Sequence, residues 1–170
     1  AQYPGMAKGL APDILERLDK VRPGTARQMM EADAEELMKT DVTQPCVYAA
    51  DLVSAFALEE RGIKADAVAG YSLGEIAALA YAGAFSPEEG MELVMKRGAA
   101  MQRASEMHET GMAAVLKLND EQVISLASKY DQVFPVNFNC PGQISVAGDK
   151  KELSSFGADV KEAGGLVRIL

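Results

Sequence analysis

The chain has 170 residues, of which 48% are apolar, 25% charged and 6% aromatic, and this composition excludes an intrinsically disordered segment. Its 17 Lys and Arg against 25 Asp and Glu give a net charge of −8, which argues against sequence-independent binding to nucleic acid or anionic lipid, because both need a basic face. No apolar run approaches the ~18 residues of a membrane span, and the first residues do not show the charged n-region and apolar h-region of a signal peptide. We therefore expect a soluble, cytoplasmic protein with one compact domain, or one domain with a small insertion.

Cysteine and histidine are scarce. The two cysteines, Cys46 and Cys140, form neither a disulfide framework nor a metal cluster with the single histidine, His108. We expect both cysteines to be buried as small apolar residues, and no cofactor or metal is expected. His108 lies in a polar stretch that is typical of an exposed connector, so a role as general base is disfavoured.

The first third of the chain is predicted to be helical. Apolar residues at helical spacing predict a helix over residues 12–20, ended by Pro23 and Gly24, and a further helix over residues 27–39. Another helix is predicted to start at residues 43–45, with Pro45 near its first position. It is apolar on most sides, so we expect it to be buried against a sheet, and Gly62 can serve as its C-terminal cap.

The next elements are predicted to be strand, turn and helix. Residues 66–70 are a short apolar run that indicates a strand, and a helical stretch follows at residues 76–81. Ser86-Pro87-Glu88-Glu89 fits a capping box with proline at the first helical position. We expect the helix that it opens to end around Ala104.

The character of the sequence changes at Gly111. Strands are predicted over residues 112–118, 133–139, 143–148 and 166–170, and helices over residues 119–129 and 150–163. The order β-α-β-β-α-β is the ferredoxin-like arrangement. The sequence therefore predicts a large α/β part over residues 1–110 and a small α+β subdomain over residues 111–170.

Residues 70–74, Gly-Tyr-Ser-Leu-Gly, fit G-x-S-x-G between a predicted strand and a predicted helix. This context favours a nucleophile elbow, in which glycines on both sides allow a sharp turn that projects the Ser72 hydroxyl. The Leu73 N–H, at the helix N-terminus, could then stabilise an oxyanion. The alternative is that Ser72 only caps the helix.

Arg97 is placed on or beside the apolar face of its predicted helix, whereas Lys96 and Arg103 are expected to be more exposed. A guanidinium in that position needs a partner, because an unpaired buried charge is very costly. The partner could be a structural Asp or Glu, or it could be a substrate carboxylate held by two hydrogen bonds.

Together these features resemble the malonyl-CoA:acyl carrier protein transacylases of type II fatty acid synthesis, an acyltransferase family that polyketide synthases share. The matching segments occur in the family's order along the whole chain. They are residues 1–6, 43–45, 70–75, 97–102, 111–115 and 137–143.

The resemblance implies a large α/β-hydrolase-like acyltransferase domain, incomplete here, with a complete ferredoxin-like α+β subdomain. It implies that Ser72 takes the malonyl group from malonyl-CoA as a malonyl-serine and passes it to the phosphopantetheine thiol of acyl carrier protein. The Leu73 amide matches one oxyanion donor, and Arg97 matches the arginine that pairs with the malonyl carboxylate. Met101 would line the acyl pocket, and Asn139 falls in the subdomain segment that faces the cleft. The family also suggests a monomer.

The chain departs from the family pattern at several points. Tyr71 stands where the family most often has histidine, and the segment with the family's oxyanion glutamine does not precede Ala1. The family usually has a further stretch between Asp33 and Ala34, so we expect a segment to be missing at this point. One unbroken helix over residues 27–39 would contradict that expectation. The family's catalytic histidine comes shortly after the strand at residues 166–170. We therefore expect these 170 residues alone to have little transacylase activity.

Three other functions are compatible with parts of the sequence. A polyketide synthase acyltransferase domain uses the same serine and arginine but can load methylmalonyl. A serine esterase or lipase of the α/β-hydrolase fold shares G-x-S-x-G but does not need Arg97 on the pocket side. The third is a binding module without catalysis. Because acyl carrier proteins are generally acidic, a chain with a net charge of −8 would need a local basic patch to bind one.

Overall fold

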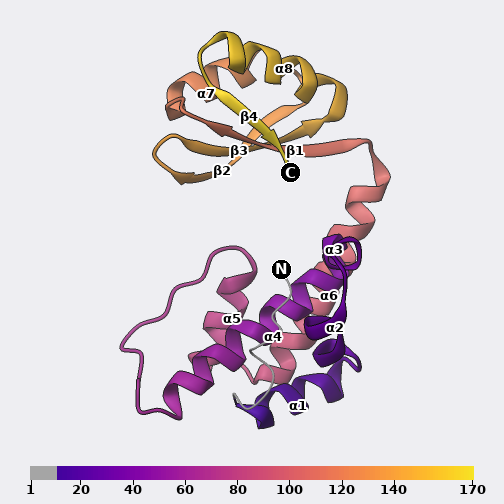
Figure 1. Cartoon of the computed structure of the whole chain (residues 1–170), viewed down its shortest axis with the longest axis vertical. Helices are drawn as coiled ribbons and strands as arrows, with labels where there is room; N and C mark the ends of the chain where they lie inside the picture. The colour runs from indigo at the N-terminus through magenta and orange to yellow at the C-terminus, as the bar shows by residue number, and fades with distance from the viewer. Residues whose placement is uncertain (1–10) are drawn as a thin grey trace. The chain divides into compact units, whose positions relative to one another are not determined.

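The computed structural model describes residues 11–170, and the chain divides into two compact units, Ala1–Ala104 and Ser105–Leu170. The boundary lies six residues before the one predicted from the sequence. The matching segment at residues 1–6 lies outside the described residues. Figure 1 shows the helices of the first unit and the sheet of the second.

The first unit is built around one long buried helix, α4, which contacts α1, α2, α3 and α5. Its apolar residues occur on most sides, so it is buried nearly all round. Tyr48 and Val53 on this helix are fully buried in the core of the unit. The helices are α1 (Pro12–Val21), α2 (Thr25–Glu31), α3 (Ala34–Met38), α4 (Thr40–Glu59), α5 (Leu73–Tyr81) and α6 (Pro87–Met107), which continues past the boundary at Ala104.

The helix predicted over residues 27–39 is two helices, α2 and α3. The chain is extended at Ala32, with φ −62° and ψ 138°. Asp33 then caps α3, its side chain accepting a hydrogen bond of 2.8 Å from the Glu36 N–H. The spacing of apolar residues in the sequence stays helical across this break, so it does not reveal it. The Asp33 carboxylate nevertheless caps a new helix and separates α3 from α2.

Helix α4 begins at Thr40, so Pro45 lies inside it and not near its first position. The Lys39 carbonyl accepts hydrogen bonds from the Val42 and Thr43 N–H groups and closes the first turn before the proline. The predicted cap at the other end is confirmed. Gly62 has φ 82°, and its N–H donates to the Glu59 carbonyl at 2.8 Å.

The strand predicted over residues 66–70 is absent. These residues are exposed and irregular, with a bend at Asp66, and no strand in the described part of the chain pairs with them. A strand needs the hydrogen-bonding groups of a neighbouring strand, and all four described strands belong to the second unit. The segment instead runs as irregular chain between α4 and α5.

The second unit is a four-stranded antiparallel sheet with two helices on one face (Figure 1). The strand order is β2-β3-β1-β4, and the element order β-α-β-β-α-β is the one predicted from the sequence. Asn119 and Gln122 form a capping box at the start of the first helix. The elements are β1 (Thr110–Leu116), α7 (Asp120–Ala127), β2 (Val133–Cys140), β3 (Gln143–Asp149), α8 (Lys150–Glu162) and β4 (Leu166–Ile169).

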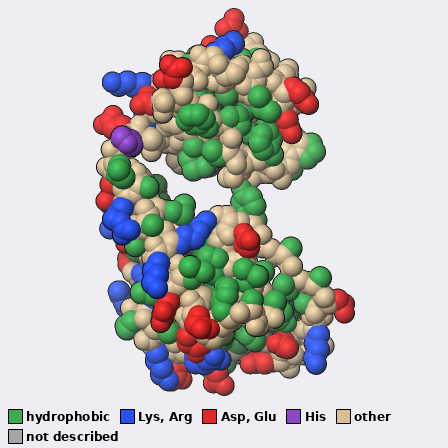
Figure 2. Space-filling model, turned by 180° about the vertical axis from the view of Figure 1, so that it is seen from behind, with side chains coloured by type: hydrophobic (Ala, Val, Ile, Leu, Met, Phe, Trp, Pro, Cys, Tyr) green, Lys and Arg blue, Asp and Glu red, His purple; other side chains and the backbone are tan. Residues whose placement is uncertain are grey.

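The core of the second unit lies between the sheet and the helices. Val115 in β1 and Phe156 in α8 are almost fully buried there. Side chains along a strand alternate between the two faces of the sheet. Met112 on β1 and Phe134 on β2 lie on the face away from the helices and keep 38% and 52% of their surface exposed. Figure 2 shows hydrophobic side chains on the surface of this unit.

Candidate active site

Ser72 lies in a tight turn immediately before α5. The Gly74 N–H donates to the Tyr71 carbonyl at 2.9 Å, which closes a four-residue turn with Ser72 as its first central residue. Ser72 has φ 53° and ψ −109°, values near the first central position of a type II′ turn, where glycine is the usual residue. A serine held in this strained conformation is a feature of the nucleophile elbow.

Only one of the two glycines in the motif is sterically required in the described structure. A Cβ on Gly70 would lie 2.0 Å from the Gly74 carbonyl oxygen and 2.2 Å from the Glu75 nitrogen. A Cβ on Gly74 would meet nothing within 4 Å. Gly70 therefore lets the chain that enters the turn pass close to the first turn of α5. The sequence predicted that the glycines on both sides of Ser72 are needed for the turn, and the steric requirement holds for Gly70 alone.

The Ser72 side chain is exposed and makes no capping hydrogen bond to α5. Its Oγ instead accepts a hydrogen bond of 3.0 Å from Arg97 Nη2. The alternative that Ser72 only caps the helix is therefore wrong. The next residue, Leu73, has a buried side chain, and its N–H donates no hydrogen bond within the described residues.

Arg97 is half-buried on α6, while Lys96 and Arg103 are exposed, as the sequence predicted. No ion pair within residues 11–170 involves Arg97, so the structural Asp or Glu considered as its partner is absent from that part of the chain. Its partners are neutral. Nη2 donates to Ser72, and Nη1 donates to Oε1 of Gln44 on α4.

Gln44 is the residue at this site that the sequence reasoning missed. Its side chain is 5% exposed, and its Nε2 donates to the Met101 sulfur at 3.2 Å. Met101 itself is 45% exposed. An amide within an apolar helix was the available signal, because a buried amide needs polar partners.

The structure thus brings together Ser72, Arg97 and Met101 in the first unit. Asn139 belongs to the second unit, where it is exposed on β2 and its Nδ2 donates to Ser145 Oγ at 3.1 Å. His108 also belongs to the second unit, directly after α6, and it is exposed as expected.

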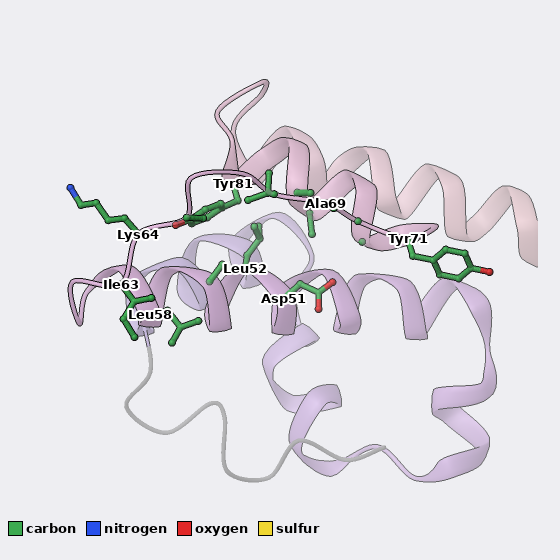
Figure 3. A pocket seen from close by; sticks show the side chains of 15 residues that line it. Asp51, Leu52, Leu58, Ile63, Lys64, Ala69, Tyr71 and Tyr81 are labelled. Atoms are coloured by element: carbon green, nitrogen blue, oxygen red, sulfur yellow. The ribbon is translucent and has the colours of Figure 1, made fainter. Parts of the chain in front are cut away.

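An apolar cavity of about 430 Å³ lies beside the turn but does not include Ser72 or Arg97. Side chains of α4, α5 and the segment between them line it (Figure 3). Asp51 extends into this region from α4, and loss of hydration there raises the pKa of its carboxyl group. Tyr71 contributes to the lining, but its ring points away from the labelled apolar side chains.

The cysteines differ in exposure. Cys46 is 1% exposed, and burial raises the pKa of its thiol. Cys140 is exposed, so the expectation that it is buried is wrong. It is the last residue of β2, in the exposed end of that strand at the turn into β3 and outside the core of the unit.

Residues 11–170 contain no group of three or more His, Cys, Asp or Glu placed to hold a metal ion. Within the same residues, no helix combines the length and the apolar character needed to cross a membrane.

Known proteins resemble both the sequence and the structure. Residues 14–169 match the model of the acyl transferase domain family. A malonyl CoA-acyl carrier protein transacylase from Mycolicibacterium smegmatis is 40% identical over 161 residues, covering 93% of this chain and 53% of the relative.

Solved structures of malonyl transacylases are also similar to this chain. The crystal structure of malonyl CoA-acyl carrier protein transacylase from Clostridium perfringens has a TM-score of 0.90 at 33% identity, and it covers 100% of this chain and 57% of its own. A malonyl-transacylase in complex with a type II polyketide synthase acyl-carrier protein has a TM-score of 0.88 at 32% identity, covering 95% of this chain and 54% of its own. The chain spans about half the length of the relatives that it matches.

Proposed function

The chain belongs to the acyl transferase domain family, with malonyl CoA-acyl carrier protein transacylases among its relatives, and from that membership we propose that the protein transfers a malonyl group from coenzyme A to acyl carrier protein. The observation that carries the proposal is the 3.0 Å hydrogen bond from Arg97 Nη2 to Ser72 Oγ. It places a cation beside a strained, exposed hydroxyl.

The 3.0 Å distance between Arg97 Nη2 and Ser72 Oγ is compatible with an arginine that binds the carboxylate of a malonyl ester on Ser72. In such an ester the carbonyl carbon and one methylene separate the free carboxylate from Ser72 Oγ. A guanidinium that reaches Oγ in the unloaded protein can therefore reach the carboxylate of the bound acyl group and pair with it by two hydrogen bonds. An acyl group without that carboxylate gains nothing from Arg97, which is the basis of selectivity.

The transfer proceeds in two balanced steps. Ser72 Oγ attacks the thioester carbonyl carbon and its proton passes to a general base; the C–S bond then breaks, and the base returns the proton to the departing coenzyme A sulfur. In the second step the carrier protein's phosphopantetheine thiol attacks the malonyl ester, a thioester forms, and Ser72 regains its proton. The Leu73 N–H has no hydrogen-bond partner among residues 11–170, which supports a role as oxyanion donor in both steps.

The remaining assignments belong to the same proposal. Met101 lines the acyl pocket, which its contact with Gln44 supports, and Asn139 is a further substrate-binding residue. The first unit, Ala1–Ala104, is part of a large α/β-hydrolase-like domain, and the second unit, Ser105–Leu170, is a ferredoxin-like subdomain, supported by the sheet order β2-β3-β1-β4.

The relative bound to a polyketide acyl-carrier protein favours a second context for the same chemistry, polyketide synthesis. An esterase is disfavoured because it has no use for a half-buried arginine at the nucleophile.

Intact-mass measurement after incubation with malonyl-CoA or acetyl-CoA tests the proposal. The intact protein, with whatever sequence flanks these residues, is expected to gain a malonyl group that Ser72→Ala abolishes. Arg97→Ala should slow malonylation roughly a hundredfold through the loss of charge-assisted hydrogen bonds, and leave acetylation nearly unchanged. Arg103→Ala, an exposed arginine on the same helix, is the matched control. Equal loading by both thioesters in the wild-type protein would refute selective malonyl transfer.

A further inference from the structure

Gln44 connects two residues of the candidate site through a single buried amide. Its Oε1 accepts from Arg97 Nη1, and its Nε2 donates to the Met101 sulfur at 3.2 Å. The orientation of the amide follows from its partners, because a guanidinium only donates and a thioether only accepts. Arg97 and Met101 are four residues apart on α6, so one amide from α4 holds a full turn of that helix.

A close approach between α4 and α6 makes this contact possible. Gly98 is buried on α6, and a Cβ at this position would lie 3.1 Å from both the Asp41 Cα and the Thr40 carbonyl oxygen. The Thr40 N–H also donates to Gln102 Oε1 at 3.1 Å. The helices are thus fixed together within one turn of Gln44, which gives its side chain a defined distance to Arg97.

The partners of Arg97 orient its guanidinium without neutralising it. Elsewhere in the same unit Arg17 donates to both carboxylate oxygens of Glu88, at 2.6 and 2.8 Å, and its charge is compensated by that pair. Arg97 donates instead to an amide oxygen and a hydroxyl oxygen. A carboxylate at position 44 would form an ion pair with Arg97, and an incoming substrate carboxylate would have to compete with it.

We propose that Gln44 is a positioning residue that holds Arg97 toward Ser72 while keeping its charge available for an acyl carboxylate, so that the neutrality of residue 44 sets the preference for carboxylated acyl groups. This inference rests on the proposed function, because it concerns the acyl group that Ser72 accepts.

The isosteric change Gln44→Glu tests it, since shape is retained and only charge is added. In the intact protein, the rate of Ser72 acylation is measured by quenched intact mass with malonyl-CoA and with acetyl-CoA. Gln44→Glu is expected to lower malonylation by roughly tenfold to a hundredfold, the range for losing a charge-assisted hydrogen bond, and to change acetylation by less than about threefold. Retained acetylation also shows that the variant is folded. Gln44→Met, which removes both hydrogen bonds without adding charge, should lower malonylation but keep a malonyl-to-acetyl ratio above that of Gln44→Glu.

Gln28→Glu provides a matched control. Gln28 also accepts from an arginine, Arg22 Nη1, at 2.6 Å, and its Nε2 donates to Glu36 at 2.7 Å. Neither contact involves Ser72 or Arg97, so the change, although it places a carboxylate beside Glu36, should leave the malonyl-to-acetyl ratio unchanged. A wild-type ratio in Gln44→Glu would overturn the role of Gln44 while wild-type malonylation still stands. Failure of the wild-type protein to accept malonyl at Ser72 would instead refute the proposed function, and this inference with it.

Discussion

Replacing Gly70 by alanine tests the geometry of the turn that carries Ser72. The new Cβ would lie 2.0 Å from the Gly74 carbonyl oxygen and 2.2 Å from the Glu75 nitrogen, both backbone atoms that no rotamer change can move. The chain entering the turn must retreat by about 1 Å to reach even the shortest contacts that Cβ atoms make, and misplacement of this size costs about a hundredfold in rate. Such a shift also takes Ser72 Oγ out of hydrogen-bond range of Arg97 Nη2, now at 3.0 Å.

The assay is the single-turnover rate of Ser72 acylation by malonyl-CoA in the intact protein. Gly74→Ala is the control from the same motif, because a Cβ there meets nothing within 4 Å and alanine favours the helix that contains it. We expect Gly70→Ala to be slower by about a hundredfold or more, and Gly74→Ala to remain within about threefold of wild type. Equal losses in the two variants would refute the reasoning that only Gly70 is sterically required.

Three further predictions concern the stability and reactivity of residues 1–170. Asp51→Asn should raise the melting temperature at neutral pH, because the raised pKa of Asp51 means that folding disfavours its ionised form. The gain should shrink as the pH falls through that raised pKa and vanish below the carboxyl's unfolded value, so a constant gain down to acid pH would contradict this cause. A thiol reagent should modify only Cys140 in the native protein, and Cys46 as well after denaturation, as counted by mass. Asn119→Ala removes the α7 capping box and should lower the free energy of unfolding of the second unit by about 1 kcal/mol in a urea titration; an unchanged midpoint would show that the cap contributes nothing.

Local signals in the sequence were sufficient for most helices and for the whole second unit. The capping box at Ser86 is present in the structure, with the Ser86 N–H donating to Glu89 at 2.8 Å and the Glu89 N–H donating back to Ser86 Oγ. The helix boundaries that failed did so where two local signals competed. Pro45 marks a helix start in many sequences, but the Lys39 carbonyl had already closed the first turn of α4.

Features that depend on residues far apart in the sequence could not be predicted from local sequence patterns. The strand predicted over residues 66–70 has a suitable local composition, but a strand forms only where another strand pairs with it. The sequence identified Ser72 and Arg97 separately, one by motif and one by its place on an apolar face. Their hydrogen bond joins positions 25 residues apart. Gln44 joins the site from still further along the chain, 53 residues from Arg97, so periodicity within its own helix could not reveal its partner.

The backbone conformation of Ser72 lowers the stability of the folded chain. With φ 53° and ψ −109°, the residue occupies a region that glycine enters freely and that costs other residues of order 1–3 kcal/mol. Ser72→Gly should therefore make the chain more stable while it removes the hydroxyl that Arg97 contacts. A selection for thermostability alone would favour glycine at this position, and the proposed function accounts for the serine because it requires the hydroxyl.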